Sequence, residues 1–264
     1  MYEEYVLENY KESGAPRSHH KDTSVAIPDI LTKSAPLPSI SILSHVKCLD
    51  TLPADHPALK YVIDRKIPSK YINELYYAPR FMKYVNIIQP GKFKTVAQDH
   101  PRLIIPYFNK AGKCFAIQGR AFGKEDPKYF TIKVDENEEK IFGLDRVDEA
   151  KRIYIVEGPL DSLFLSNAIA VSGASFSSPT IEKLKSNATV VYDNEPRSKE
   201  LTKLISKTIE QGFSVCLWPE AVTEKDVNEM VLAGRTPEEV QQMIDANTFS
   251  GAEAQLRFAA WRKC

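Results

Sequence analysis

The sequence lacks the features that would assign it to a secreted or membrane-bound class. No apolar run in its 264 residues approaches the length of a transmembrane helix, and the polar, acidic N-terminus MYEEYVLENYKESG is unlike a signal peptide. The four cysteines (Cys48, Cys114, Cys216 and Cys264) are far apart and include no CxxC pair, so we expect free thiols in a reducing compartment. No internal repeat is visible. These absences predict a globular protein of the cytoplasm without membrane contact.

A net charge is also lacking, because 35 Lys and Arg residues balance 35 Asp and Glu residues. The balance conceals an uneven distribution. Residues 80–130 contain ten Lys and Arg against three Asp and Glu, a net charge of +7, whereas residues 131–229 contain twelve against eighteen, a net charge of −6. A basic segment suits a polyanion and an acidic segment suits cations, so we expect two halves with different ligands.

The sequence of the first half indicates an N-terminal arm followed by a small subdomain of helices and strands. Residues 11–40 are rich in Pro, Ser and Lys without a sustained period, which indicates a linker or extended arm over residues 1–45. Apolar spacing predicts one helix that ends near residue 67 and a second over residues 71–76. The runs RLIIPYFN and CFAIQGRAF are typical of strands joined by a hairpin, and KYFTIKV adds a further strand. We assign residues 46–143 to a basic α+β subdomain.

The second half alternates strands with helices. Strands are predicted at RIYIVEG, IAVSGA, TVVYDNE and FSVCLWP, and helices at PLDSLFLSNA, SPTIEKLKSN and SKELTKLISKTIEQG. This alternation is typical of βαβ units and a parallel sheet, which we place at residues 144–234. Two more helices, at TPEEVQQMIDANTF and GAEAQLRFAAWRKC, predict a C-terminal helical segment over residues 235–264.

Polar clusters follow three strands of this predicted sheet: Glu157 with Asp161, Asp193 with Glu195, and Lys225 with Asp226 and Asn228. Because ligands of open parallel sheets bind at the carboxyl ends of the strands, we expect the clusters to share one site. Asp193 and Glu195 alternate on a strand, so both carboxylates project to the same side and raise each other's pKa unless a cation lies between them. Mg²⁺ prefers such oxygen ligands.

A structural alternative exists for each cluster taken singly. Acidic residues after strands often serve as helix N-caps, a role open to Asp193 or to Ser198. A lone DxE or EGxxD pattern is usually structural. Three clusters at the same end of one predicted sheet favour a metal site.

The segments that carry these clusters, YIVEGPLDSLFL, VVYDNEP and KDVNEMV, resemble the signature of the TOPRIM domain of DnaG-type primases, topoisomerases and some nucleases. Upstream, RLIIPYFNKAGKCFAIQGRAFGKEDPKYFTIK and KIFGLDRV resemble the basic subdomain that precedes TOPRIM in DnaG-type primases, most closely those of T-even-like bacteriophages. The resemblance extends over residues 50–235. It implies an α/β fold: a TOPRIM domain with a Rossmann-like parallel sheet flanked by helices, preceded by a smaller basic α+β subdomain and followed by C-terminal helices.

The resemblance also implies roles for individual residues. The carboxylates expected to be catalytic are Glu157, Asp161, Asp193 and Glu195. The expected ligands of Mg²⁺ or Mn²⁺, with two ions anticipated, are Glu157, Asp193, Glu195 and Asp226. The residues expected to contact template and nucleotide are Arg102, Arg120, Lys128 and Lys140, to which the sequence itself adds Lys225 and, as an aromatic ring beside a cation, Tyr129. Two positions depart from relatives, which often have Asp at 195 and sometimes a second acid at 228.

The function implied is that of a DNA primase, a DNA-directed RNA polymerase that makes short RNA primers on single-stranded DNA from ribonucleoside triphosphates. A replicative helicase is an expected partner. Two alternatives remain: a TOPRIM nuclease that uses the same carboxylates and metals, and a catalytically weak nucleic-acid-binding partner of a helicase. The zinc-binding module with which these primases begin has no counterpart here, because no Cys/His set has zinc-ligand spacing.

Overall fold

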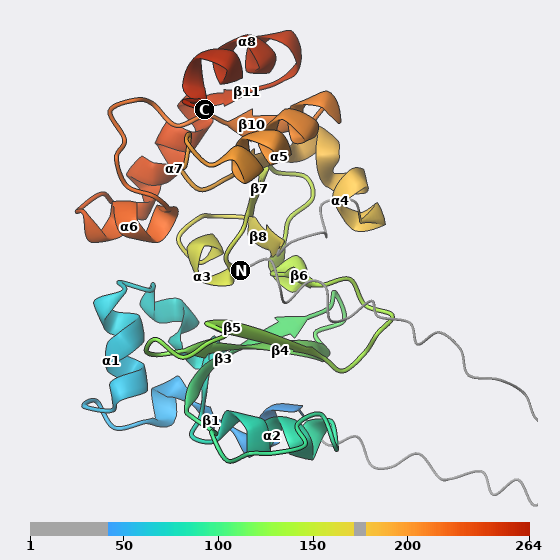
Figure 1. Cartoon of the computed structure of the whole chain (residues 1–264), viewed down its shortest axis with the longest axis vertical. Coiled ribbons are helices and arrows are strands. Elements are labelled where there is room, and N and C mark those ends of the chain that lie inside the picture. Colours follow the sequence, from blue (N-terminus) through green and yellow to red (C-terminus); the bar gives the residue numbers. More distant parts are fainter. Residues whose placement is uncertain (1–41, 172–177) are drawn as a thin grey trace, which may run out of the picture. The chain divides into compact units, whose positions relative to one another are not determined.

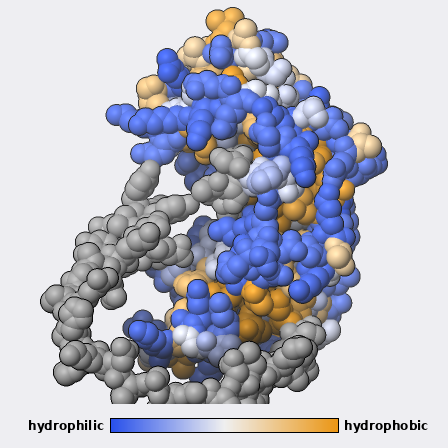
Figure 2. All heavy atoms as spheres, turned by 90° about the vertical axis from the view of Figure 1, so that its right-hand side faces the viewer, coloured by the Kyte–Doolittle hydropathy of each residue, from blue (hydrophilic) through white to orange (hydrophobic). Residues whose placement is uncertain are grey.

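The computed structural model describes residues 42–171 and 178–264, which form two β-sheets with helices packed on them (Figure 1). The predicted arm of residues 1–45 lies outside the described residues, except for a short 3-10 helix, η2 (Ile42–His45). All four cysteines are described and are free thiols, as predicted. No helix in the described ranges is long and apolar enough to cross a membrane. On the face in Figure 2, hydrophilic side chains predominate, with apolar ones between them.

The first sheet is antiparallel and belongs to the basic half of the chain. Its strands follow the order β1-β2-β3-β4-β5, with the bounds Lys47–Cys48, Tyr76–Ala78, Arg102–Phe108, Cys114–Ala121 and Tyr129–Lys133. The predicted hairpin is confirmed, since β3 pairs with β4 and its turn contains Gly112 with a φ of 73°. The third predicted strand is β5, which pairs with β4.

Both faces of this sheet are covered. Consecutive side chains of a strand point to opposite faces, and along β3 Leu103, Ile105 and Tyr107 join a core cluster shared with the second sheet. Ile104, between them, joins a separate cluster with helix α2 (Phe81–Ile88). Helix α1 (Pro57–Asp64) packs on the shared cluster through Val62. The continuous apolar run of β3 is therefore accommodated without exposing either face to water.

The second sheet is parallel at its centre and antiparallel at its edges. Its order is β11-β10-β9-β7-β8-β6. In chain order the bounds of β6 to β11 are Ile141–Phe142, Ile153–Val156, Ala168–Val171, Ala188–Val191, Ser214–Cys216 and Thr248–Phe249. β7 pairs in parallel with β8 and β9, and β9 with β10. Every residue of β7, β8 and β9 is buried, as expected of parallel strands covered on both faces.

Helices cover both faces of this sheet. In chain order the bounds of α3 to α8 are Pro159–Ser162, Pro179–Leu184, Lys199–Glu210, Val227–Leu232, Pro237–Ala246 and Gly251–Trp261. Residues of α4, α5 and α8 pack with Ile155 and Val190 in one cluster. Residues of α3, α6 and α7 pack with Val156 and Val191 in the cluster shared with the first sheet. The predicted α/β class, a parallel sheet flanked by helices and preceded by a smaller α+β part, is confirmed.

Local differences from the sequence expectations have physical reasons. The helix expected at residues 71–76 is a 3-10 helix, η4 (Ser69–Glu74), because Tyr76 is extended and pairs with Ile104 of β3. The helix expected at PLDSLFLSNA is reduced to α3, since Asn167 adopts a positive φ of 57° and turns the chain into β8. Strand β6 precedes the expected boundary after residue 143, yet it pairs with β8. The C-terminal segment contributes β11, which pairs with β10, besides its two helices.

Candidate active site

Two adjacent strands carry carboxylates to one edge of the second sheet. Glu157 directly follows β7, and Asp193 comes two residues after the end of β9. The strands are parallel neighbours, with Val156 opposite Val191, so both acids emerge at the carboxyl edge where ligands of such sheets bind. Burial, followed by the charge of Glu157, raises the pKa of Asp193. The two acids are therefore direct neighbours.

These acids line a cleft of about 650 Å³ to which both sheets contribute. The carboxylates that line it are Glu157, Asp161, Asp193, Asp226 and Glu229. Cations and an aromatic ring from the other half of the chain line it as well: Arg65, Arg120, Lys128 and Tyr129. The acidic and basic halves noted in the sequence thus meet in one cavity, which we call the acidic cleft.

Asp161 lies in the first turn of α3 and is held by α6. Its Oδ1 accepts a hydrogen bond from the backbone N–H of Asn228 at 3.1 Å. Burial, reinforced by the charge of Asp226, raises the pKa of Asp161 to about 7. Gly158 leaves space for this carboxylate, because a Cβ atom at position 158 would lie 2.4 Å from Oδ2 of Asp161. The glycine of the EGxxD segment therefore has a steric role in the site.

Lys225 lies between Asp193 and Glu195. Its ammonium is 3.6 Å from Oδ2 of Asp193 and 3.0 Å from Oε1 of Glu195, and the bond to Glu195 is the main cause that raises the pKa of Lys225. Burial and the neighbouring carboxylates raise the pKa of Asp193 to about 7, although the charge of Lys225 acts to lower it. Glu195 does not line the acidic cleft; it lines a neighbouring groove. The predicted acidic pair is thus bridged by a cation of the protein itself.

Glu157 has an oxygen without a partner. Its Oε1 is buried, no described residue donates to it, and burial raises the pKa of the group. A bound cation would give this oxygen a partner and would reduce the repulsion between the carboxylates of Glu157 and Asp193. Carboxylate oxygens are the ligands that Mg²⁺ prefers, so the chemistry of these residues fits that ion. Among the described residues, no three His, Cys, Asp or Glu side chains form a group that could hold an ion. Asp226 already accepts a hydrogen bond from the N–H of Glu229 as the N-cap of α6.

The cations of the cleft are stacked on tyrosine rings. Arg120 is only 4% exposed; its Nε donates to the hydroxyl of Tyr61, and its guanidinium lies 5.6 Å from the ring centroid of Tyr61 and 4.8 Å from that of Tyr129. Arg65 stacks on Tyr61 as well, at 5.0 Å. Burial, and then the charges of Arg120 and Arg65, lower the pKa of Lys128. Cations held close together in this way suit phosphate groups.

Arg102 and Lys140 are not brought into this cleft. Arg102 is 2% exposed, and its guanidinium donates to the carbonyls of Gly119 at 2.8 Å and Pro127 at 2.7 Å. In place of the expected contact with template, it therefore supports the loop between β4 and β5 from the face that packs on α2, where it lies over the ring of Phe81. Lys140 precedes β6 and is absent from the residues that line the cleft.

Sequence reasoning missed the joint between Arg65 and Asn228. Nη1 of Arg65 donates to Oδ1 of Asn228 at 2.5 Å, and Nδ2 of Asn228 donates to the Arg65 carbonyl at 2.8 Å. Close by, Nζ of Lys66 donates to the Val231 carbonyl at 3.0 Å. These bonds join the end of α1 to α6. The only sequence signal was a cation at a helix C-terminus, which is too common to single out a residue.

Comparisons with known proteins show which proteins the chain resembles. No family model matches the chain. A DNA primase of Enterobacteria phage T4 is 36% identical over 266 residues, which cover all of this chain and 75% of the relative. Among solved structures, the zinc-binding and RNA polymerase domains of the Aquifex aeolicus primase superpose with a TM-score of 0.57 at 21% identity, over 78% of this chain and 59% of that one. A DnaG primase catalytic domain bound to single-stranded DNA gives a TM-score of 0.57 at 17% identity, over 76% of this chain and 74% of that one.

Proposed function

This chain belongs to the DNA primase family, and we propose that it synthesises short RNA primers on single-stranded DNA as a DNA-directed RNA polymerase. The observation that carries the proposal is the acidic cleft, where carboxylates of one sheet and cations of the other share a single cavity. Nucleotidyl transfer needs both, because it moves a phosphoryl group whose charge must be held and oriented.

We assign the carboxylates to the metal. Glu157 and Asp193 would hold one or two Mg²⁺ or Mn²⁺ ions, joined by Asp226 once it leaves its capping bond and by Glu195 once it leaves Lys225. When bound, such ions lower the pKa of an attacking hydroxyl and neutralise charge on the leaving phosphate oxygens. The buried, unpartnered oxygen of Glu157 supports this assignment.

We assign the cations to the polyanions. In the proposed reaction a 3′-hydroxyl attacks the α-phosphate of a ribonucleoside triphosphate, and pyrophosphate leaves. Arg65, Arg120 and Lys128 would bind the triphosphate and the template backbone, which restricts the reactants to one orientation. The ring of Tyr129, 39% exposed at the cleft, suits stacking on a base. Lys225 would bind phosphate after release from its carboxylate partners. A replicative helicase stays a predicted partner.

The test is ribonucleotide incorporation on a single-stranded DNA template, with Mg²⁺ and with a chelator. We expect labelled RNA products in Mg²⁺, none with chelator, and a loss of roughly a hundredfold or more for Asp193→Asn. The variant should keep its melting temperature, because it removes a carboxylate that is repelled by its neighbours. Asp55→Asn, at an exposed acid outside the cleft, is the matched control and should be fully active.

The same assay separates the alternatives. A nuclease would shorten the labelled template in Mg²⁺ without making RNA. A catalytically weak binding partner of a helicase would make no RNA in Mg²⁺, and its Asp193→Asn variant would still bind DNA and stimulate the helicase. Either result, or a normally active Asp193→Asn protein, contradicts the proposal.

A further inference from the structure

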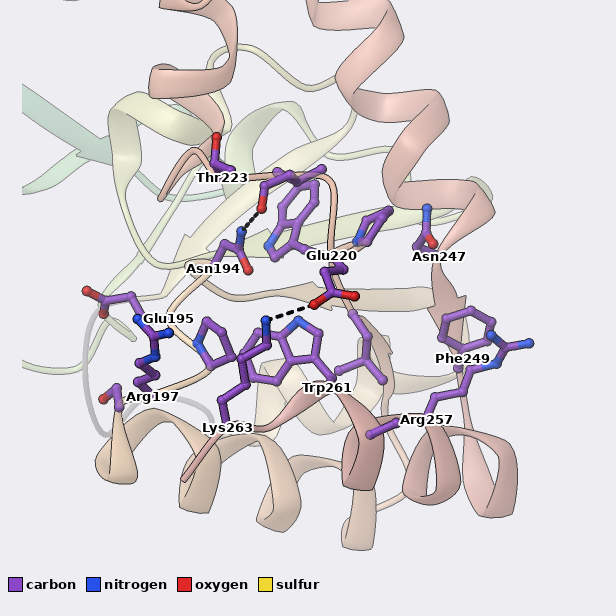
Figure 3. A pocket seen from close by; sticks show the side chains of 17 residues that line it. Asn194, Glu195, Arg197, Glu220, Thr223, Asn247, Phe249, Arg257, Trp261 and Lys263 are labelled. Atoms are coloured by element: carbon purple, nitrogen blue, oxygen red, sulfur yellow. Dashed lines mark hydrogen bonds and ion pairs between the residues drawn. The ribbon is translucent and has the colours of Figure 1, made fainter.

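A second cavity, of about 760 Å³, lies entirely in the second half of the chain (Figure 3). Its walls are the loop 194–198 after β9, the segment 217–223 after β10, Phe249 of β11 and the end of α8 with Lys263. The sequence contains two tryptophans, Trp218 and Trp261, and both line this cavity. We therefore call it the tryptophan groove.

The groove offers aromatic surface on a rigid support. Trp218 is 3% exposed, and its Nε1 donates to the Tyr192 carbonyl at 2.8 Å, which fixes the floor. Trp261 is half-buried and lies near the middle of the groove in Figure 3. At the far end, Arg257 lies 4.1 Å from the ring centroid of Phe249. Planar side chains of this kind stack on nucleobases of any sequence.

Two cations of the groove, Arg197 and Lys263, are available to an anion, whereas Arg257 is paired with Glu253 at 2.9 Å. The carboxylates of the groove are already paired. Glu195 is bound by Lys225, and Glu220 by Lys263 at 3.2 Å. The side chain of Lys263 is 46% exposed and that of Glu220 is 88% exposed, so water weakens their ion pair. A phosphate can therefore replace Glu220 as the partner of Lys263. Arg197 is exposed and has no carboxylate within ion-pair distance in the described part of the chain. Aromatic surface together with such cations suits a nucleotide.

The tryptophan groove adjoins the acidic cleft. Asp193 lines the cleft, and the five residues that follow it line the groove. The backbone N–H of Lys263 donates to the Pro196 carbonyl at 2.8 Å, so the end of α8 is fixed against this shared loop. A strand whose 3′ end reaches the carboxylates can therefore continue over the loop into the groove. The cations assigned to template and triphosphate come mainly from the other sheet, which leaves this side to the primer.

We propose that the tryptophan groove binds the nascent RNA primer, with a base stacked on Trp261 and phosphates held by Arg197 and Lys263. The proposal rests on the primer synthesis proposed above and extends it to the product strand. It explains why both tryptophans and the C-terminal end of α8 gather beside the carboxylates. It also gives a function to α8, which contributes nothing to the acidic cleft.

The first test is the affinity for a short RNA oligonucleotide, followed through tryptophan fluorescence and confirmed by anisotropy of labelled RNA. We expect binding roughly tenfold weaker for Trp261→Ala, and affinity near that of the wild type for Trp261→Phe, which keeps an aromatic ring. Arg197→Ala changes an exposed residue and should weaken binding without affecting folding. Leu256→Ala, on the same helix but 75% exposed and outside the groove, is the matched control.

The second test is the length distribution of RNA products. Trp261→Ala and Arg197→Ala should lower the yield of longer products more than that of dinucleotide, because only a longer primer reaches the groove. Arg262→Ala, at a neighbouring cation outside the groove, should leave the distribution unchanged.

The outcomes for the groove and for the activity are distinguishable. One outcome is that the wild type makes RNA while the Trp261 and Arg197 variants bind RNA and extend primers normally. That result contradicts primer binding in the tryptophan groove and leaves the proposed function standing. RNA binding that is lost in Arg120→Ala but kept in Trp261→Ala places the primer in the acidic cleft, which also overturns the proposal. A protein that makes no RNA contradicts the proposed function, and the binding comparison still decides the groove.

Discussion

Gly158 shows how a missing side chain shapes the acidic cleft. Its φ of −102° is available to any residue, so the backbone does not require glycine. The requirement comes from the Asp161 carboxylate, which occupies the space of a Cβ atom. A methyl group at 158 would therefore displace a flexible carboxylate and leave the chain path intact.

For Gly158→Ala we expect folded protein with about tenfold lower ribonucleotide incorporation, because misplacing a catalytic group by about 1 Å has large effects on rate. Incorporation and melting temperature are measured together. Gly123→Ala is a matched control, since its Cβ would also meet a carboxylate, Oε2 of Glu125 at 2.9 Å, but outside the cleft. Equal activities of the two variants would contradict the steric role of Gly158.

Tyr154 gives the fold a pH dependence that is separate from the cleft. Its hydroxyl donates to Asp245 of α7 at 2.7 Å, and burial, followed by that bond, raises the pKa of Tyr154 to about 12. Since the folded-state pKa lies above the ordinary value of 10.0, the stabilisation is complete below pH 10 and is lost as the pH rises toward 12.

Tyr154→Phe should therefore be less stable than the wild type at pH 8, by about 1 kcal/mol for the lost hydrogen bond. The difference should shrink as the pH rises from 10 to 11.5, where the wild type loses a contribution that the variant no longer has. Urea denaturation across this range measures both proteins. A stability difference that stays constant with pH would refute the assignment.

The positions of Arg102 and Arg120 show what the sequence could not predict about single residues, namely the face of the sheet to which a side chain points. Both were predicted to face template, and both lie on the β3–β4 hairpin. In its register Arg120 pairs with Leu103, so Arg102, one position away, points to the opposite face. That register depends on the turn and on an irregularity at Tyr107 and Phe108. The carboxylates were easier to place, because Glu157 and Asp193 come one and two residues after the ends of buried strands.

At the scale of elements, the joint between α1 and α6 fixes the cations of the cleft relative to its acids. Asn228 is 3% exposed and makes two hydrogen bonds with Arg65, while its own N–H binds Asp161. Asn228 thus connects the cation at the C-cap of α1, through its side chain, with an acid of α3, through its backbone N–H. An acid at this position would instead add a charge to a crowded site.

Asn228→Ala should destabilise the protein by about 2 kcal/mol, because buried partners lose their hydrogen bonds. Incorporation should fall further than the loss of folded protein explains, since α1 carries Tyr61, which holds Arg120, and ends at Arg65 of the cleft. Denaturation midpoints and KM for nucleotide are the measurements. Asn187→Ala removes an exposed amide that binds the Glu149 carbonyl and serves as the control. A variant with normal stability and normal KM would show that the joint is dispensable.

The elements differ in how well the sequence predicted them. β7, β8 and β9 were predicted because each is a short apolar run buried on both faces. β6 and β11 have two residues each and were missed, because such short strands carry no periodic pattern and exist only through their partners β8 and β10. The helix after β7 was predicted too long, since apolar residues 163–165 are buried by tertiary contacts and not by a continued helix.

At the scale of the whole molecule, the uneven charge distribution becomes a cavity with two kinds of lining. The sequence showed a basic and an acidic segment but not that they meet, and Arg65 lies outside the basic segment altogether. Bringing residues so distant in sequence together depends on the core shared by the two sheets.

Arg120→Ala should weaken binding to single-stranded DNA and reduce the slope of log K against log salt by about 0.7, as expected for one lost phosphate contact. Titrations between 50 and 200 mM salt, roughly the range over which such contacts are lost, measure the slope. Arg80→Ala, at an exposed arginine of the same half outside the cleft, should change it less. If both slopes equal that of the wild type, Arg120 is not a phosphate contact.

Lys225 has a practical consequence for experiments on this protein. Because its ammonium already bridges Asp193 and Glu195, the carboxyl edge of the sheet is partly neutralised before any ion arrives. The polypeptide can therefore be purified and stored with chelator, and activity lost by chelation should return at once when Mg²⁺ is added back, without a refolding step. Ions of the proposed metal site would displace the ammonium of Lys225 from these carboxylates, so their apparent affinity should be higher for Lys225→Ala than for the wild type.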